Sequence, residues 1–311
     1  MEPAPEVLAR VAEIASDNRS GADTLARKAA EVLELQAAAP STDGTGLREA
    51  LAEAARLLVA AQPAMASIFN LANAVLFAIE GVDDAPSLRN AVISTCRGFT
   101  AKIARVHEVI SEAAREEVPD GGTVLTHSYS STVADALLGA WRCGRRFSVI
   151  CTESRPLCEG VSLARTLAAA HIPVTLIADA ALHHHFQEAS LALSGADTVA
   201  REGVLNKAGT ALVALSARAR RKKFLVLAGT HKWLAPARRL VWVRRENPRE
   251  ILPEDIAGIC VSNVYFDLTP LRLVTALITQ QGALPPAAVR ERLGELKVHP
   301  ALVGRRAAPA A

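Results

Sequence analysis

Between residues 123 and 228, short apolar runs alternate with longer segments that have the periodicity of amphipathic helices. This alternation predicts βαβ units, in which parallel strands form a sheet and the connecting helices cover its two faces. The expected strands are 123–126, 147–152, 173–178, 191–194 and 224–228. The expected helices between them are 133–141, 161–170 and 207–220. Because such crossovers are right-handed, the carboxyl ends of the strands meet at one edge of the sheet.

The segments that follow four of these strands carry the candidate chemistry. They are residues 127–130 and 153–156, Asp179 and Asp197. Open α/β sheets bind their ligands at the carboxyl ends of the strands. We therefore expect a ligand site built from these strand ends.

Asp197 follows the buried strand 191–194 after a small residue, Gly195. A single carboxylate at a strand end can act as a general acid or base, which makes Asp197 a candidate catalytic residue. It can equally cap a turn, and the sequence leaves both roles open.

A turn is expected next, at Glu202 and Gly203, and a helix is expected to open within residues 206–210. At that helix start, backbone N–H groups, the Asn206 amide and the Lys207 ammonium can come together. Such an arrangement suits a phosphate group. Asn206 and Lys207 are therefore candidate phosphate ligands.

Three further strand-end residues each have two possible roles. Arg155 can hold phosphate oxygens with its planar guanidinium, or it can tether the loop before Pro156. Ser128 is a candidate catalytic hydroxyl and Ser130 a candidate phosphate ligand, but either can simply cap the helix that follows. A reactive serine also needs a base within reach, and the adjacent His127 need not face it.

Residues 1–117 show helical periodicity, apart from a breaker-rich segment at 16–21 and a loop at 40–46, and residues 118–122, VPDGG, end it. This change predicts a domain boundary after residue 117. The expected fold class is α/β, with a helical domain, 1–117, followed by a parallel-sheet domain, 118–311.

Arg19, Ser20 and Gly21 precede one of the predicted N-terminal helices. Their backbone N–H groups can face an anion at the start of that helix, which makes them candidate phosphate ligands. An ordinary turn between two helices is the alternative.

Composition narrows the class of protein. The 35 basic and 32 acidic side chains give a net charge of +3, too balanced to predict direct nucleic-acid binding. No uninterrupted apolar run reaches the ~18 residues that a membrane span needs, and the N-terminal segment lacks the features of a signal peptide. The five cysteines have no paired metal-ligand spacing, and the consecutive histidines 183–185 diverge on a helix. We expect a cytoplasmic protein with reduced thiols and without a metal, a cofactor or a membrane contact.

Several motifs occur in the order found in the initiation factor 2B superfamily. They are THSYS at 126–130, TESRP at 152–156, GAD at 195–197, NKAGT at 206–210 and NVYFDLTP at 263–270. The chain resembles this superfamily from about residue 118 onward. The superfamily includes the regulatory alpha subunit of the eukaryotic exchange factor, methylthioribose-1-phosphate isomerase and ribose-1,5-bisphosphate isomerase.

The resemblance implies a Rossmann-like C-terminal domain, a dimer built mainly through it, and a phosphorylated pentose in the cleft between the domains. In the isomerases, a cysteine after Thr-His works with the GAD aspartate in moving a proton between sugar carbons. Here the aspartate is Asp197, and Ser128 has the position of the cysteine. The alpha subunit usually has a glutamate where Asp197 stands, although its pattern at 126–130 is closer.

Three functions therefore stay open. Asp197 favours an aldose–ketose isomerase that acts on a phosphorylated pentose of the ribose 1-phosphate type. Ser128 favours a non-catalytic sugar-phosphate sensor or regulatory subunit, because a hydroxyl is a far weaker acid than a thiol, whose pKa is ~8.5. A structural interaction module with a vestigial pocket is the third.

The C-terminal segment adds an expectation about assembly. Its apolar residues exceed what one short helix needs, and they are Val264, Phe266, Leu268, Leu271, Val274 and Ile278. Together with the resemblance, this surplus predicts a homodimer with a two-fold interface.

Overall fold

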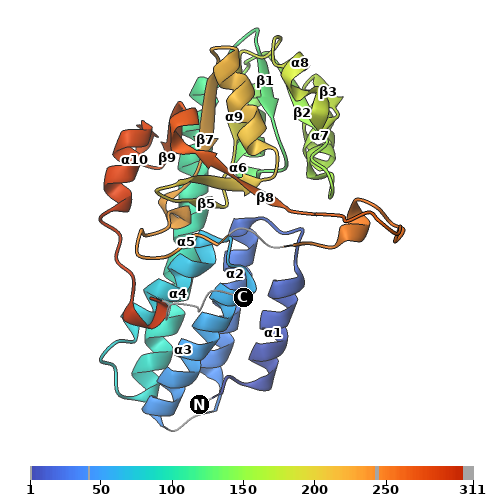
Figure 1. Ribbon diagram of the computed structural model, residues 1–311. Helices are drawn as coiled ribbons and strands as arrows, with labels where there is room; N and C mark the ends of the chain where they lie inside the picture. Colours follow the sequence, from blue (N-terminus) through green and yellow to red (C-terminus); the bar gives the residue numbers. More distant parts are fainter. Residues whose placement is uncertain (1, 41–42, 242–244, 304–311) are drawn as a thin grey trace. The chain divides into compact units, whose positions relative to one another are not determined.

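The computed structural model describes residues 2–40, 43–241 and 245–303 (Figure 1). These residues form two compact units, which we call the helical unit and the sheet unit. The helical unit takes the described residues of Met1–Arg105, His231–Val241 and Arg292–Ala311. The sheet unit takes those of Val106–Thr230 and Trp242–Glu291.

The helical unit consists of helices whose apolar faces pack together, as the N-terminal periodicity predicts. They are α1 (Pro5–Ser16), α2 (Ala22–Ala38), α3 (Gly44–Ala61), α4 (Ala66–Ala78) and the first part of α5 (Ala85–Glu117). Leu25, Leu51 and Leu71, on three different helices, are fully buried. The predicted helical N-terminal region is therefore confirmed. Among the described residues, no helix combines the length and the apolar content that a bilayer crossing requires.

Two later segments complete the helical unit through side-chain amides of α4. Asn70 Nδ2 donates to the carbonyl oxygens of His231 and Trp233, both at 2.8 Å. Asn73 Oδ1 accepts from the amide of His299 at 2.7 Å. The compact units are thus discontinuous along the chain, and the predicted division into two continuous domains stays a prediction.

The sheet unit is built on a mostly parallel sheet of seven strands. In spatial order they are β10 (Gly282–Leu284), β9 (Ala276–Thr279), β7 (Lys223–Leu227), β4 (Leu191–Ser194), β1 (Thr123–Thr126), β2 (Ser148–Thr152) and β3 (Val174–Ile177). Each neighbouring pair is parallel except β9 and β10. The strands predicted between 123 and 228, and the α/β class, are therefore confirmed.

Helices cover both faces of this sheet. On one face, α6 (Ser131–Arg142), α7 (Glu159–Ala169) and the end of α5 share one apolar cluster with the strands. On the other, α9 (Thr210–Ala219) packs on β4 and β7 (Figure 1).

The remaining short helices of the chain are η1 (Asp179–Ala181), α8 (Leu182–His185), η2 (Thr230–Lys232), η3 (Pro248–Glu250), η4 (Leu271–Leu273), α10 (Pro286–Leu293) and η5 (Pro300–Leu302).

A second, antiparallel sheet corrects the prediction for residues 202–210. It consists of β5 (Thr198–Val199), β6 (Gly203–Lys207) and β8 (Phe266–Pro270), with β6 in the middle. Gly203 already belongs to a strand, so the hairpin turn precedes it, and the helix predicted from 207 begins at Thr210. The partner of β6 is β8, which comes much later in the chain and is invisible to a local pattern.

The apolar residues on which the predicted dimer rested divide between the interior and the surface of the sheet unit. Leu271, Val274 and Ile278 are buried, with 0, 4 and 2 % of their surface exposed. Val264 stays exposed. The apolar spacing from 271 to 278 therefore reflects core packing and not a free surface. The homodimer itself stays a prediction.

Candidate functional site

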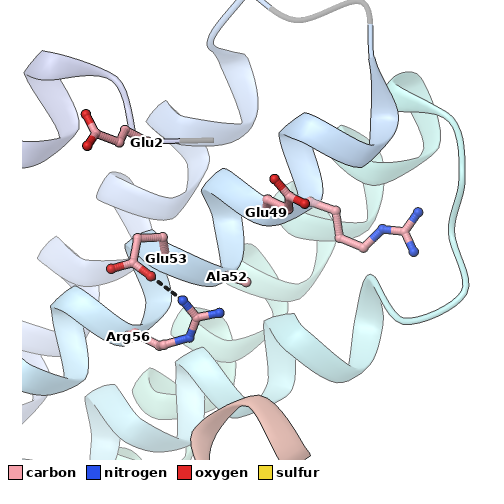
Figure 2. Close-up of a pocket in the computed structure, with 6 residues that line it drawn as sticks. Glu2, Glu49, Ala52, Glu53 and Arg56 are labelled. Carbon is pink, nitrogen blue, oxygen red and sulfur yellow. Dashed lines mark hydrogen bonds and ion pairs between the residues drawn. The ribbon is translucent and has the colours of Figure 1, made fainter.

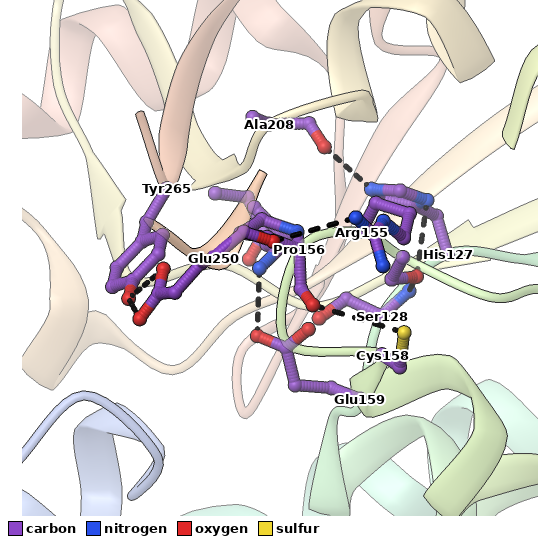
Figure 3. A network of polar contacts seen from close by, with 12 residues as sticks. His127, Ser128, Arg155, Pro156, Cys158, Glu159, Ala208, Glu250 and Tyr265 are labelled. Carbon is purple, nitrogen blue, oxygen red and sulfur yellow. Dashed lines mark hydrogen bonds and ion pairs between the residues drawn. The ribbon is translucent and has the colours of Figure 1, made fainter. Parts of the chain in front are cut away.

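The loops after β1, β2 and β3 share a network of hydrogen bonds at the carboxyl edge of the parallel sheet (Figure 3). His127 Nδ1 lies 2.6 Å from the Thr152 hydroxyl, which lies 3.1 Å from that of Ser154. Asp179 accepts from the backbone amides of Ser154 and Arg155, at 2.8 and 2.7 Å. The network thus brings together three of the four strand ends that the sequence assigns to this edge.

The hydrogen bonds of His127 determine its tautomer. Its Nε2 lies 2.8 Å from the carbonyl oxygen of Ala208, which can accept but not donate, so Nε2 carries the proton. Nδ1 then accepts from the Thr152 hydroxyl. Burial lowers the pKa of His127, which favours this neutral form. Both ring nitrogens of His127 are therefore engaged in hydrogen bonds, to Thr152 and to Ala208. The side chain holds these segments together and does not act as a base for Ser128.

Ser128 and Ser130 differ in what their hydroxyls do. Ser128 has a left-handed backbone, with a φ of 65°, and its amide donates to Ser154 Oγ at 2.7 Å. Only 9 % of Ser128 is exposed, and among the described residues its hydroxyl has no hydrogen-bond partner. Ser130 caps α6, because its Oγ accepts from the amide of Val133 at 3.4 Å. A contact of Ser130 with phosphate stays a prediction.

Arg155 tethers its loop, and its guanidinium remains accessible to a ligand. Its backbone amide is held by Asp179, and its Nη2 lies 3.4 Å from the carbonyl oxygen of Glu250. The residue nevertheless remains exposed. The loop is therefore tethered through the backbone, and the predicted phosphate contact of the guanidinium stays a prediction.

Lys207 is buried, which is rare for a lysine without a counter-ion. Its Nζ donates to Glu159 Oε1 at 2.8 Å and lies 5.1 Å from the centre of the Tyr265 ring. The Tyr265 hydroxyl lies 2.6 Å from both carboxylate oxygens of Glu250 (Figure 3). Burial and this hydrogen bond raise the pKa of Tyr265. The positive charge of Lys207 is therefore compensated inside the protein.

Asn206 ties three elements of the sheet unit together. Its Nδ2 donates to Ser194 Oγ at the end of β4, at 3.1 Å, and to Thr210 Oγ1 at the start of α9, at 3.0 Å. These bonds give the side chain a structural role. Its predicted contact with phosphate stays a prediction.

A carboxylate of this chain occupies the start of α9, where the sequence led us to expect a phosphate. Asp267 on β8 accepts from the amides of Gly209 and Ala211, at 2.8 and 3.2 Å. Burial raises the pKa of Asp267. Sequence reasoning missed this residue because the pairing of β8 with β6 is what carries it to the helix.

Asp197 follows the carboxyl end of β4, and His127 and Ser128 follow that of β1. Because these two strands are parallel neighbours, the three residues lie at the same edge of the sheet. It is half-buried, and its amide donates to the carbonyl oxygen of Leu205 on β6 at 3.0 Å. A carboxylate is therefore present at the expected edge. Its acid–base role stays a prediction.

Arg19, Ser20 and Gly21 lie in the helical unit, just before α2. The amides of Arg19 and Ser20 both donate to Asp17 Oδ1, at 3.1 and 2.9 Å, and Lys28 Nζ lies 2.6 Å from Oδ2. Although burial opposes ionisation, Lys28 and these amides hold the pKa of Asp17 well below its usual range. The turn is thus organised by its own carboxylate, and binding of an external anion stays a prediction.

The helical unit also contains an ion cluster that no sequence signal indicates. Asp23, in the first turn of α2, accepts from His231 Nε2 at 2.9 Å and lies 3.3 Å from Lys232 Nζ. Burial lowers the pKa of His231. Despite burial, the charge of Lys232 and the hydrogen bond from His231 hold the pKa of Asp23 well below its usual range.

Two other features lie away from these networks. An open hollow of about 670 Å³ on the helical unit is lined by Glu2, Arg48, Glu49, Ala52, Glu53 and Arg56 (Figure 2). Its lining carries both acidic and basic side chains, and none of them belongs to a predicted site residue. Within the described residues, no three His, Cys, Asp or Glu side chains are placed to hold a metal ion. His183 instead lies with its Nδ1 3.3 Å from Ser216 Oγ.

Comparison with known proteins identifies the family. The model of the initiation factor 2 subunit family matches residues 18–286. This chain belongs to that family. Ribose 1,5-bisphosphate isomerase from Archaeoglobus fulgidus is 35 % identical to it, over 93 % of this chain and 94 % of the isomerase. A Pyrococcus furiosus protein described as similar to subunit 2 of translation initiation factor eIF-2B is 34 % identical, over 91 % and 98 %.

Solved structures agree with this membership. Translation initiation factor eIF-2B from Pyrococcus horikoshii OT3 superposes on this family member with a TM-score of 0.80 at 31 % identity, over 92 % of this chain and 98 % of that one. The 5-methylthioribose 1-phosphate isomerase of the same organism has a TM-score of 0.73 at 21 % identity, over 93 % and 87 %, which shows a shared fold alone. The resemblance predicted from the motifs is therefore confirmed.

At its sheet edge, this family member presents a half-buried carboxylate, serine hydroxyls and an exposed guanidinium. A carboxylate can move protons, and hydroxyls can bond to sugar hydroxyls. A guanidinium can bind phosphate oxygens through two parallel hydrogen bonds. The chemistry of these groups suits a polyhydroxylated anion.

Proposed function

We propose that this protein is an aldose–ketose isomerase that acts on a phosphorylated pentose of the ribose 1-phosphate type. The observation that carries the proposal is its 35 % identity to the ribose 1,5-bisphosphate isomerase of A. fulgidus over 93 % of the chain. A match of that extent includes both compact units, so it is not limited to a widely shared binding fold.

Asp197 is the residue to which we assign the transfer of a proton between two sugar carbons. Its half-buried carboxylate at the end of β4 supports the assignment, because general acid–base groups act from partly enclosed positions at strand ends. We assign phosphate binding to the exposed guanidinium of Arg155. Further candidates for contact with substrate are Arg19, Ser20, Gly21, Ser128, Ser130, Asn206 and Lys207.

A non-catalytic sugar-phosphate sensor is the second candidate. It is favoured by Ser128, which has the position of the isomerase cysteine, because a hydroxyl is a far weaker acid than a thiol. The relative from P. furiosus whose name refers to a translation initiation factor also favours it.

We further propose that the protein is a cytoplasmic homodimer and that its sugar-phosphate-binding domain is Rossmann-like and spans residues 118–311. Exposed apolar side chains of the sheet unit between β7 and β8 support the dimer, and they are Ile251, Ile256, Ile259 and Val264. Burying them against a second copy would stabilise the pair by roughly 25 cal/mol per Å² of apolar surface.

The test compares wild type, Asp197→Asn and, as a control, Asp135→Asn, which alters an exposed carboxylate of α6. Each protein is given ribose 1-phosphate or ribose 1,5-bisphosphate, and the ketose product is followed by ¹³C NMR. Because general acid–base catalysis contributes ~10²–10⁴-fold, Asp197→Asn should lose turnover by that factor while Asp135→Asn keeps it.

Binding is measured in parallel by thermal unfolding. A ligand present at ~100 times its dissociation constant stabilises the folded state by about 2.7 kcal/mol. Stabilisation by these pentoses without turnover would favour the sensor. Neither stabilisation nor turnover would reject both candidates.

A further inference from the structure

The proposed reaction needs a second proton-transfer group besides Asp197. A pentose phosphorylated on C1 has no free carbonyl, so its ring must open, and the ring oxygen must receive a proton as the C1–O bond breaks. Most titratable side chains at the sheet edge are already committed. The ring nitrogens of His127 and the carboxylate oxygens of Asp179 have partners, and Glu159 pairs with Lys207.

Cys158 is a group at this edge that stands apart from these partnerships. It is the N-terminal cap residue of α7, is half-buried, and has a left-handed backbone with a φ of 57°. Its sulfur has one weak contact, at 3.8 Å from the carbonyl oxygen of Pro156. Cysteines that act in proton transfer or as nucleophiles are found in partly enclosed positions of this kind, including the starts of helices.

The loop backbone ties Cys158 and Ser128 to the same residue. The Ser128 amide donates to Ser154 Oγ at 2.7 Å, and the Cys158 amide donates to the Ser154 carbonyl oxygen at 3.0 Å. Figure 3 draws both residues in one network of polar contacts.

Two oxygens of these loops have no hydrogen bond among the described residues. Glu159 Oε2 is buried and unpaired, and the hydroxyl of Ser128, a residue with 9 % of its surface exposed, has no partner. Buried polar atoms are normally satisfied, so unpaired oxygens of this kind indicate a place where a ligand supplies the missing partners.

Building on the proposed isomerase function, we propose that Cys158 is the catalytic acid that protonates the ring oxygen of the substrate, while Ser128 orients a sugar hydroxyl. The Asp197 carboxylate takes the proton from C2, and the electron pair of that C–H bond forms a C1=C2 double bond. The C1–O bond of the ring breaks, and its oxygen takes the thiol proton of Cys158.

The second half of the reaction restores both groups. The Cys158 thiolate takes the proton of the hydroxyl on C2, and the O–H electron pair forms the ketone. The C1=C2 pair takes the proton back from Asp197 at C1. No oxidant, reductant or water is consumed.

Three of the other four cysteines are unsuited to this role. Burial raises the pKa of Cys96 and of Cys151 to about 12, so neither thiol exchanges protons readily near neutral pH. Cys143 is exposed, and it lies at the C-terminal end of α6, whose other end is at the site. Cys143→Ser is therefore a matched control for Cys158→Ser.

The test measures turnover of ribose 1,5-bisphosphate by wild type, Cys158→Ser and Cys143→Ser. Cys158→Ser should lower kcat by ~10²-fold or more with little change in KM, since a general acid is lost. Cys143→Ser should behave as wild type.

Labelling with iodoacetamide, read by mass spectrometry, tests the wild type without relying on a variant that folds. Substrate should slow the alkylation of Cys158 but not of Cys143, and alkylation of Cys158 should abolish turnover. Full turnover in Cys158→Ser, or in enzyme alkylated at Cys158, would overturn the inference and leave the isomerase function standing. A wild type that isomerises neither pentose would overturn both.

Discussion

At the scale of single residues, the buried ammonium of Lys207 depends on its ion pair with Glu159. The Lys207 side chain is 6 % exposed and that of Glu159 is 23 % exposed, with 2.8 Å between Nζ and Oε1. Glu159→Gln keeps the shape but removes the counter-charge of a buried ammonium. Breaking a fully buried pair costs ~3–5 kcal/mol, and partial exposure of Glu159 reduces the expected loss of unfolding free energy to about 2 kcal/mol.

Urea unfolding measures that loss, and Glu112→Gln is the control. Glu112 pairs with Arg115 at 3.5 Å on the surface of α5, with 73 % of its side chain exposed. An exposed pair of this kind contributes ~0–1 kcal/mol. Equal losses in the two variants would show that Lys207 does not depend on Glu159.

At the scale of elements, the junction between β6 and α9 depends on Gly209. Its φ is +111°, and a Cβ there would lie 2.7 Å from both Cε1 and Nε2 of His127. Gly209→Ala should lower the free energy of unfolding by ~3 kcal/mol or more, because steric overlap adds to the backbone strain. Gly282→Ala, with a φ of +96° and no atom within 4 Å, carries the strain alone and should cost ~1 kcal/mol. Thermal unfolding of the two variants measures the difference, and equal values would contradict the close packing on His127.

The cap of α9 by Asp267 predicts a dependence of stability on pH. Burial raises the folded-state pKa of Asp267, so its contribution is complete below the unfolded-state pKa of ~3.9. The contribution is lost as the pH rises through the folded-state pKa, because the unfolded chain ionises more readily. Asp267→Asn does not titrate, so wild type should lose stability relative to it as the pH rises above about 4. Unfolding free energies measured at several pH values would contradict this if wild type gained instead.

At the scale of the whole molecule, the proposed dimer predicts an effect of Ile259, which is 55 % exposed. Ile259→Glu places a charge on the apolar surface that also includes Ile251, Ile256 and Val264, and it should convert dimers to monomers. Leu176→Glu alters a side chain of β3 that is 46 % exposed and should leave the dimer intact. Light scattering at micromolar protein concentration separates these outcomes. A monomeric wild type would contradict the proposal.

The sequence alone determined the parallel sheet, the helices before it and the meeting of four strand ends at one edge. These features depend on hydrophobic periodicity and on the right-handedness of crossovers, and both can be read from neighbouring residues. Asp197, His127, Ser154 and Asp179 can therefore be assigned to that edge from the sequence.

Tertiary structure alone decided what those residues and their neighbours bind. Asn206 and Lys207 end a strand and do not open a helix, because β6 pairs with a segment close to 60 residues later in the chain. Asp267 occupies the start of α9, and Lys207 finds its counter-ion on α7. Hydrogen bonds and ion pairs of this kind join residues far apart in the chain, and their energies depend on burial and distance, neither of which is encoded in local periodicity.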